Sequence, residues 1–326
     1  MSTLALKGPY WVTVRQYRRT LWLAVAAVAA SLTVIGGLRI WDAQTPDRVL
    51  ADGQRFAADE NKGYELLRLA LEYGGFYLAL LPLLVGALVA GPLVAREFES
   101  GTYRLSLTQS VSPAAWLRAK ILTATVVALL TTIALMGVFR IGWSRMAGAW
   151  YQKWSPGPYA ATGVVLLAYV LAAVAVGALI GLLIRRTLVA MAATGVFMGV
   201  VLAALGSYRW SFLAVRTVTG ATDATFPETA EGLVMEKGLI TSSGARFDEY
   251  TCWKEAAETP GVDRVEGLWA KVETQCQARH HVTGQYVDYH PSSHFWPTQL
   301  IESGILLALA ALAAYAAFRV LRARLP

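Results

Sequence analysis

Long apolar runs, separated by polar segments, dominate the pattern of hydrophobic and polar positions along the chain. Each run has close to the roughly 20 residues that a helix needs to cross the hydrocarbon core of a bilayer. The runs span residues 20–40, 73–95, 121–139, 159–184, 187–206 and 300–318. This pattern predicts an all-α integral membrane protein with six transmembrane helices.

Few prolines and few ionisable residues interrupt the runs. Pro82 and Pro92 lie in the second run, and a transmembrane helix tolerates proline where neighbouring groups satisfy the freed carbonyls. Glu302 lies near the start of the last run. Almost no other ionisable residue occurs in the runs, which argues against a proton relay or an ion-coupled carrier because these use intramembrane carboxylates or histidines.

The segment between the fifth and sixth runs is polar and far longer than a connecting loop. We expect it to form an extracytoplasmic domain, whose fold the sequence leaves open. The expected organisation is an amphipathic elbow helix at 1–19, spans one to five at 20–206 with a cytoplasmic loop at 96–120, the extracytoplasmic domain at 207–296, and the last span with a cytoplasmic tail at 297–326.

The charge distribution predicts an orientation. Only 16% of the residues are charged and 56% are hydrophobic, against about a quarter charged in soluble domains. If the N-terminus is cytoplasmic, the inner segments hold 13 of the 29 basic residues but, of the 22 acids, only Glu97 and Glu99. The positive-inside rule then predicts a multi-pass protein of the plasma membrane with both termini in the cytoplasm. The net charge of +7 is thus a topology signal, not a sign of nucleic-acid binding.

The N-terminal segment has the pattern of an interfacial helix. Four residues share one helical face, at intervals of four, three and four: Tyr10, Val14, Tyr17 and Leu21. Three arginines lie on another face: Arg15, Arg18 and Arg19. Such a helix lies in the membrane interface with its arginines among lipid phosphates. A basic flank that only fixes topology is the alternative.

Cleavage of the first run as a signal peptide is a second alternative for this region, since A-x-A sites occur at 27–29. The apolar run continues for about ten residues beyond that point, however, and we expect it to remain as a membrane span.

Sequence motifs for catalysis are absent from the chain. It contains no G-x-x-x-x-G-K-[ST] phosphate loop and no C-x-x-C, H-E-x-x-H or G-x-S-x-G motif. We therefore expect no enzymatic activity and no cofactor in this chain. If it moves a substrate, the energy comes from another chain.

The segment at 91–120, GPLVAREFESGTYRLSLTQSVSPAAWLRAK, carries a family resemblance. The stretch Arg96-Glu97-Phe98-Glu99 is followed by Gly101-Thr102, a short turn, a proline and a tryptophan. This resembles the intracellular loop of permease subunits of type 2 ATP-binding-cassette (ABC) exporters, the bacterial drug and antibiotic exporter class. In that family an acidic E-x-E or E-x-x-x-G-T stretch precedes a short coupling helix.

Other parts of the chain extend the likeness. They are the W-x-x-x-R-Q-x-R pattern formed by Trp11, Arg15, Gln16 and Arg18, the six spans, the tight Arg185-Arg186 turn, and the large segment before the last helix. The segment at 207–296 is the part least covered by the resemblance.

The resemblance implies a transport subunit that works with separate ATPases. The permease would pair with itself or a similar chain, while two ABC ATPase subunits bind ATP and Mg. The coupling helix, residues 99–107, would dock in a groove of the ATPase. The coupling residues would be Glu97, Glu99, Gly101, Thr102 and Arg104. Since few charges line the spans, we expect an amphipathic cargo, such as an antibiotic, a peptide or a lipid-like molecule.

Two acids and one glycine give a physical reason for the expected coupling role of this segment. Glu97 and Glu99 are natural partners for arginines of an ATPase or of the amino-terminal helix. Gly101 permits the sharp turn between two helices. An ordinary hairpin loop is the alternative for this segment. The alternative function is a non-transporting membrane scaffold or sensor that presents the extracytoplasmic domain.

The segment at 207–296 contains both cysteines and all four histidines. Two cysteines in one extracytoplasmic segment favour a disulfide between Cys252 and Cys276, with two unrelated thiols as the alternative. The histidines lack carboxylate or cysteine ligands at suitable spacing, and we expect no metal site.

Two G-x-x-x-G pairs, at 177–181 and 195–199, predict close helix packing, within one subunit or between two.

Overall fold

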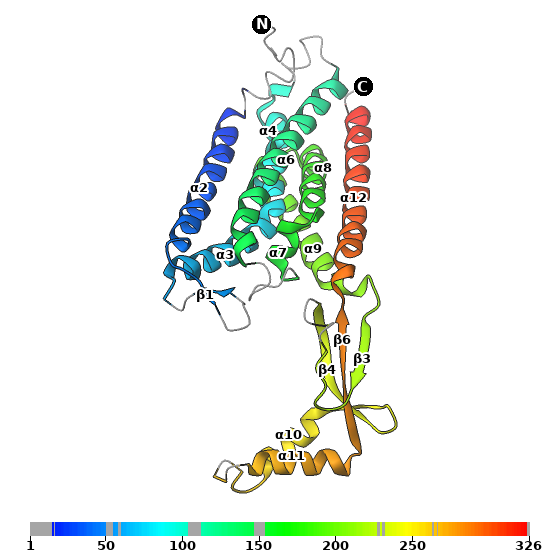
Figure 1. Cartoon of the computed structure of the whole chain (residues 1–326). Helices are drawn as coiled ribbons and strands as arrows, with labels where there is room; N and C mark the ends of the chain where they lie inside the picture. Colours follow the sequence, from blue (N-terminus) through cyan, green and yellow to red (C-terminus); the bar gives the residue numbers. More distant parts are fainter. Residues whose placement is uncertain are drawn as a thin grey trace. The chain divides into compact units, whose positions relative to one another are not determined.

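The protein is described by a computed structural model that covers residues 15, 17–49, 55–57, 60–103, 112–146, 154–226, 229, 232–262, 264–265 and 267–324. The chain divides into two compact units (Figure 1). The helical unit comprises Met1–Arg209 and Gln299–Pro326, and the inserted unit comprises Trp210–Thr298. The inserted unit begins and ends within three residues of the segment at 207–296 that the sequence sets apart.

Six stretches of the described chain are long and apolar enough to cross a membrane, as the sequence predicts. They are α2 (Arg18–Asp42), the continuous α3 (Lys62–Leu84), η1 (Val85–Ala90) and α4 (Gly91–Ser100), then α6 (Pro113–Met146), α8 (Val165–Ile184), α9 (Thr187–Tyr208) and α12 (Phe295–Arg324). Successive stretches alternate in direction, so α2 begins and α12 ends at the same end of the bundle (Figure 1). We call this the termini end, and the other the insertion end.

Helix α8 lies at the centre of the bundle. It is the most buried of the six stretches, whereas α2 is the least buried. A Cβ on Gly177 of α8 would lie 2.4 Å from the Cβ of Ala90, so glycine is required for this approach. The first G-x-x-x-G pair therefore packs α8 against the second span of the same chain.

The second span widens into a π-helix at η1. Pro92 follows directly and has no N–H to donate to the preceding turn. The N–H of Gly91 instead donates to the carbonyl of Gly86, five residues earlier. The π-helical stretch thus accommodates Pro92 without breaking the span.

The fourth span is interrupted, whereas the sequence predicts an unbroken helix over 159–184. Helix α7 (Pro156–Thr162) ends just before α8, and the side chain of Gln299 fills the break. Its Oε1 accepts hydrogen bonds from the N–H groups of Val164 and Val165, at 3.0 and 2.9 Å. Its Nε2 donates to the carbonyl of Tyr159 at 2.7 Å. A residue of α12 therefore satisfies backbone groups that the break would leave bare in lipid.

The inserted unit has the α+β fold that the sequence leaves open. Its antiparallel sheet has the order β3-β6-β4-β5. The strands are β3 (Arg216–Gly220), β4 (Leu233–Thr241), β5 (Arg246–Phe247) and β6 (Val282–His290), and the helices are α10 (Glu249–Glu258) and α11 (Leu268–Arg279). A disulfide between Cys252 and Cys276 joins the two helices, which confirms the expected pairing.

Charged side chains connect the strands of this sheet. Arg246 of β5 lies 2.6 Å from Asp288 of β6 and 3.2 Å from Glu236 of β4. Burial raises the pKa of Asp288, but hydrogen bonds from Thr217 and Arg246 outweigh it and hold the pKa below its ordinary value. Burial also lowers the pKa of His290.

Acid is therefore expected to destabilise the inserted unit. Both groups have a lower pKa in the folded than in the unfolded state, so the unfolded chain binds more protons. The stability contributed by His290 is present above its ordinary pKa of 6.5 and is lost below it. That of Asp288 is lost below 3.8. Limited proteolysis within 210–298 should accelerate between pH 7 and pH 5. His290→Gln should flatten this response, and a rate independent of pH in the wild type would contradict it.

Candidate docking site at the termini end

The site begins where the second span ends. Helix α4 stops at Ser100, and Gly101 adopts φ = +73°. This left-handed conformation favours glycine, which has no Cβ to clash with the backbone. The chain thus leaves the helix axis at the residue that the sequence indicates.

Glu97 is buried instead of facing a partner, and this corrects the expectation for that residue. It is 5% exposed. One carboxylate oxygen lies 2.6 Å from Nζ of Lys120, and the other accepts a hydrogen bond from Nε1 of Trp116 at 3.0 Å. Because both oxygens have partners inside the bundle, Glu97 joins α4 to α6 and presents no free charge to another protein.

Lys120 is itself enclosed by aromatic rings. Its Nζ lies 5.7 Å from the ring centre of Tyr17 and 5.5 Å from that of Trp116. The hydroxyl of Tyr17 donates to the carbonyl of Leu93 at 3.2 Å. The start of α2 is therefore part of the same cluster.

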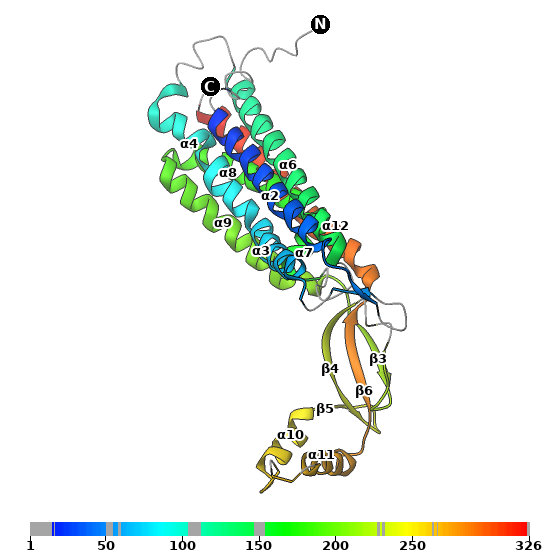
Figure 2. The ribbon, with the colours of Figure 1, turned by 60° about the vertical axis from the view of Figure 1, so that its left-hand side comes forward.

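Glu99 is exposed and connects the end of α4 to α9. Its Oε2 accepts a hydrogen bond from the N–H of Thr187, the first residue of α9, at 2.9 Å. A carboxylate at a helix N-terminus also interacts favourably with the helix dipole. Arg185 extends the contact, since its guanidinium lies 5.2 Å from the ring centre of Phe98. Helices α4 and α9 run beside each other here (Figure 2).

An open hollow of about 500 Å³ lies between α4 and α9. Its lining combines the exposed polar residues Arg96, Glu99 and Ser100 with the apolar side chains of Leu88 and Met191. The hydroxyl of Thr102 lies 2.9 Å from that of Ser100. A surface that combines polar and apolar side chains suits a protein contact.

Of the remaining site residues from the sequence, Arg15 is described, is exposed and precedes α2. Arg104 and Trp11 lie outside the described residues, as do the end of the expected coupling helix and most of the elbow helix. Arg18 and Arg19 form the first turn of α2, so these two arginines belong to the spanning helix and not to a separate one.

A second polar cluster, at the insertion end, was not predicted. Arg209 donates two hydrogen bonds to the carboxylate of Glu302, at 2.8 and 2.9 Å. Tyr169 and Tyr159 donate to the same carboxylate at 2.6 and 3.1 Å. Of these four residues, the sequence analysis singled out only Glu302, as an acid in an apolar run. An acid in a membrane span needs a partner, and Arg209, three residues after the fifth run, is one of the bases close to the end of a run.

Comparison with known proteins places the helical unit in a family. A family model described as ABC-2 membrane transporter related matches residues 20–209, which contain the first five spans and the site described above. No curated protein and no solved structure matches the chain. Since the match covers more than half of the 326 residues, the chain belongs to the ABC-2 membrane transporter related family.

Proposed function

We propose that the chain is the permease subunit of an ATP-driven ABC exporter of the plasma membrane, powered by separate ATPase subunits. Family membership supports a permease that works with an ABC ATPase. The observation that carries the coupling role is the connection of α4 to three other spans. Glu97 bonds to Lys120 of α6, Glu99 to Thr187 of α9, and Leu93 to Tyr17 at the start of α2.

This connectivity suits the transmission of force. In the proposed complex an ATPase contacts exposed Arg96, Glu99 and Ser100 and the segment that follows Gly101. Movement of this segment then displaces α4 together with the spans bonded to it. Glu97 acts through its buried bond to Lys120, as a positioning residue that keeps α4 and α6 together. ATP and Mg are bound by the partner ATPase, and this chain hydrolyses nothing itself.

The proposed cargo is amphipathic, of the class of antibiotics, peptides or lipid-like molecules. The spans offer an almost uncharged surface, and the buried ions described above are paired with each other. A charged cargo would need compensating groups that these apolar surfaces do not supply. We further propose that two permeases, identical or similar, form the complete transporter.

A membrane scaffold or sensor is the second candidate, and the inserted unit favours it. Tyr250 and Trp253 of α10 are 61% and 48% exposed, and their rings stack at 5.5 Å. Exposed aromatic residues are enriched at protein interfaces. Co-purification of a soluble ATPase with the chain in detergent separates the candidates, since a scaffold has no need of one.

Reversing the exposed charge at the site should weaken ATPase binding. Glu99→Lys removes the acceptor for the Thr187 N–H and places a cation at a helix N-terminus, which disfavours it. We expect less ATPase in pull-downs and less transport per ATP, at near wild-type expression. Glu258→Lys, on exposed α10, is the matched control and should change nothing. Unchanged ATPase association in the Glu99 variant would contradict the ATPase contact and leave this segment as a connection between two spans.

The proposed orientation places the termini end in the cytoplasm. Single cysteines at Ser2 and Ala323, in a background without Cys252 and Cys276, should resist an impermeant maleimide in intact cells. A cysteine at Ser242, in the inserted unit, should be labelled. Labelling of either terminal position from outside would contradict the orientation.

A further inference from the structure

Helix α2 is attached to the bundle by polar contacts at both of its ends. At the termini end, the hydroxyl of Tyr17 bonds to the Leu93 carbonyl, and Lys120 lies over the Tyr17 ring. At the insertion end, Asp42 is the last residue of α2 and is 2% exposed. These contacts fix where α2 begins and ends relative to its neighbours.

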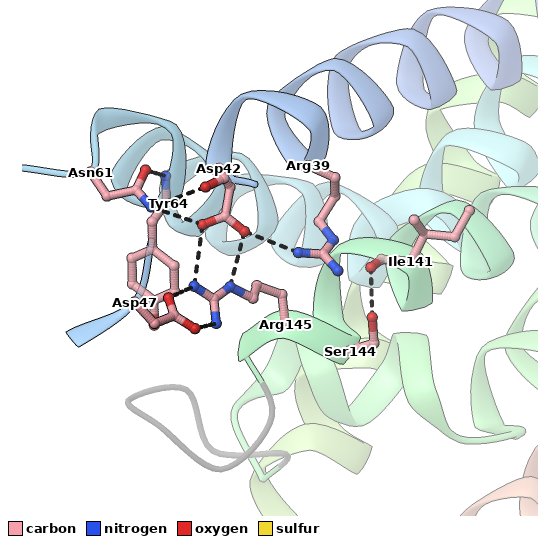
Figure 3. Close-up of polar contacts among 8 residues, drawn as sticks. All are labelled: Arg39, Asp42, Asp47, Asn61, Tyr64, Ile141, Ser144 and Arg145. Atoms are coloured by element: carbon pink, nitrogen blue, oxygen red, sulfur yellow. Dashed lines mark hydrogen bonds and ion pairs between the residues drawn. The ribbon is translucent and has the colours of Figure 1, made fainter. Parts of the chain in front are cut away.

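The contacts at the insertion end form a tight network (Figure 3). Arg145 of α6 donates from Nε to Asp42 at 2.9 Å and from Nη1 to Asp47 at 3.0 Å. Asn61, which precedes α3, donates to the Asp42 carboxylate at 3.0 Å, and Arg39 does the same. Helix α2 is thus held to both α3 and α6.

Between these two attachments α2 contributes several small residues to the helix contacts, and space remains beside it. Ala24 of α2 faces Ala124 and Ala128 of α6 nearer the termini end. Ser31 of α2 faces Leu135 of α6 nearer the insertion end. Two hollows of about 100 and 410 Å³ lie there. Leu81 lines both of them, so they are neighbours along α2, and we call the two hollows together the α2 groove.

The α2 groove is apolar and long. Its lining runs along α2 from Tyr17 to Ile35, which is about 27 Å at 1.5 Å per residue. That is close to the roughly 30 Å thickness of the hydrocarbon core of a bilayer. Val85 and Val89 of the π-helical stretch line its termini-end half, and π-helical stretches are frequent at functional sites.

We propose that the α2 groove binds an acyl chain of an anionic phospholipid, whose headgroup lies at Arg18 and Arg19. The walls of the α2 groove lack the contacts with each other that close helix packing supplies, and a flexible hydrocarbon chain has the shape to supply them. A helix of a second protein, about 10 Å across, is too wide for a groove between helices already in contact.

Charge selects the headgroup. Arg18 and Arg19 are exposed, and Arg18 lies one turn before Leu21, which lines the groove. Guanidinium groups bind phosphate through paired hydrogen bonds. Trp22, 63% exposed, lies beside them, and tryptophan favours the headgroup level of a membrane. This site is separate from the ATPase contact and does not depend on the proposed function.

The test is lipid retention by the full chain. The protein is reconstituted in vesicles of phosphatidylglycerol and phosphatidylethanolamine, re-extracted, washed with detergent, and analysed by mass spectrometry for bound phospholipid. Ala24→Phe and Ala128→Phe fill the groove and should lower retention about tenfold, since excluding about two methylene groups is enough for that. Ala26→Phe, on the exposed side of α2, is the matched control and should retain lipid.

Two further measurements keep the test decisive if the phenylalanine variants fold poorly. The double variant Arg18→Gln/Arg19→Gln should retain less phosphatidylglycerol relative to phosphatidylethanolamine. A benzophenone amino acid at Val127, which lines the groove, should crosslink lipid after the wash, whereas one at exposed Val126 should not. Equal crosslinking from both positions, or retention of a compound other than a phospholipid, would overturn the proposal.

Discussion

Arg209→Ala is expected to lower the free energy of unfolding of the helical unit by about 3–5 kcal/mol, the usual cost of leaving a buried charge without its partner. Glu302 is fully buried, and Arg209 is only 9% exposed. Without the guanidinium, the two tyrosine hydroxyls remain as donors, but no cation balances the carboxylate. Unfolding in mixed detergent, followed by circular dichroism, measures the loss.

An exposed ion pair of the same chain provides the control. Lys254 and Glu258 lie 3.8 Å apart with side chains 60% and 69% exposed. Lys254→Ala should cost little, because exposed pairs contribute about 0–1 kcal/mol. Adding Glu302→Gln to Arg209→Ala should recover part of the stability, since it removes the unpaired charge. Equal costs for Arg209→Ala and Lys254→Ala would show that the buried pair is not a stabilising centre.

The position of this pair in the chain adds to its importance. Arg209 and Glu302 flank the inserted unit, Trp210–Thr298, on its two sides. Their ion pair therefore holds together the two points at which the chain leaves and re-enters the helical unit. Loss of the pair should also increase proteolysis at these two connections, which distinguishes a local opening from uniform destabilisation.

The spans were predictable because their signal is local. Length and hydropathy alone identify six helices, and the bilayer imposes that length. The break in the fourth span was not predictable, because the group that satisfies it is Gln299, 135 residues after Val164. The π-helical stretch had a partial signal in Pro92, but proline alone does not distinguish a kink from a widened turn.

The sequence singled out the segment of the candidate site, but not the surroundings of each residue in it. Counting charges drew attention to Glu97 and Glu99. A charge count cannot tell that Glu97 is buried, because its burial depends on Trp116 and Lys120, which follow it by 19 and 23 residues in the sequence. The β6 sequence, VTGQYVDYH, is rich in β-branched and aromatic residues, and this was an available signal for a strand.

Removing the buried cation at the termini end should lower stability and ATPase association together. Lys120→Met leaves the Glu97 carboxylate buried with only the Trp116 donor, and we expect a loss of about 3–5 kcal/mol in unfolding free energy. ATPase association should fall with it, because the connection between α4 and α6 is lost. Glu99→Lys, in contrast, should reduce association with little change in stability.

The charge-swapped pair, Glu97→Lys with Lys120→Glu, tests whether charge pairing itself is responsible. The swap restores opposite charges at the 2.6 Å contact, although it turns the Trp116 N–H toward a cation. We expect recovery of part of the stability and of ATPase association relative to either single variant, measured by thermal unfolding and by pull-down. If the swap is no better than the single variants, the local packing of Lys120 between its two aromatic rings, and not the ion pair, joins α4 to α6.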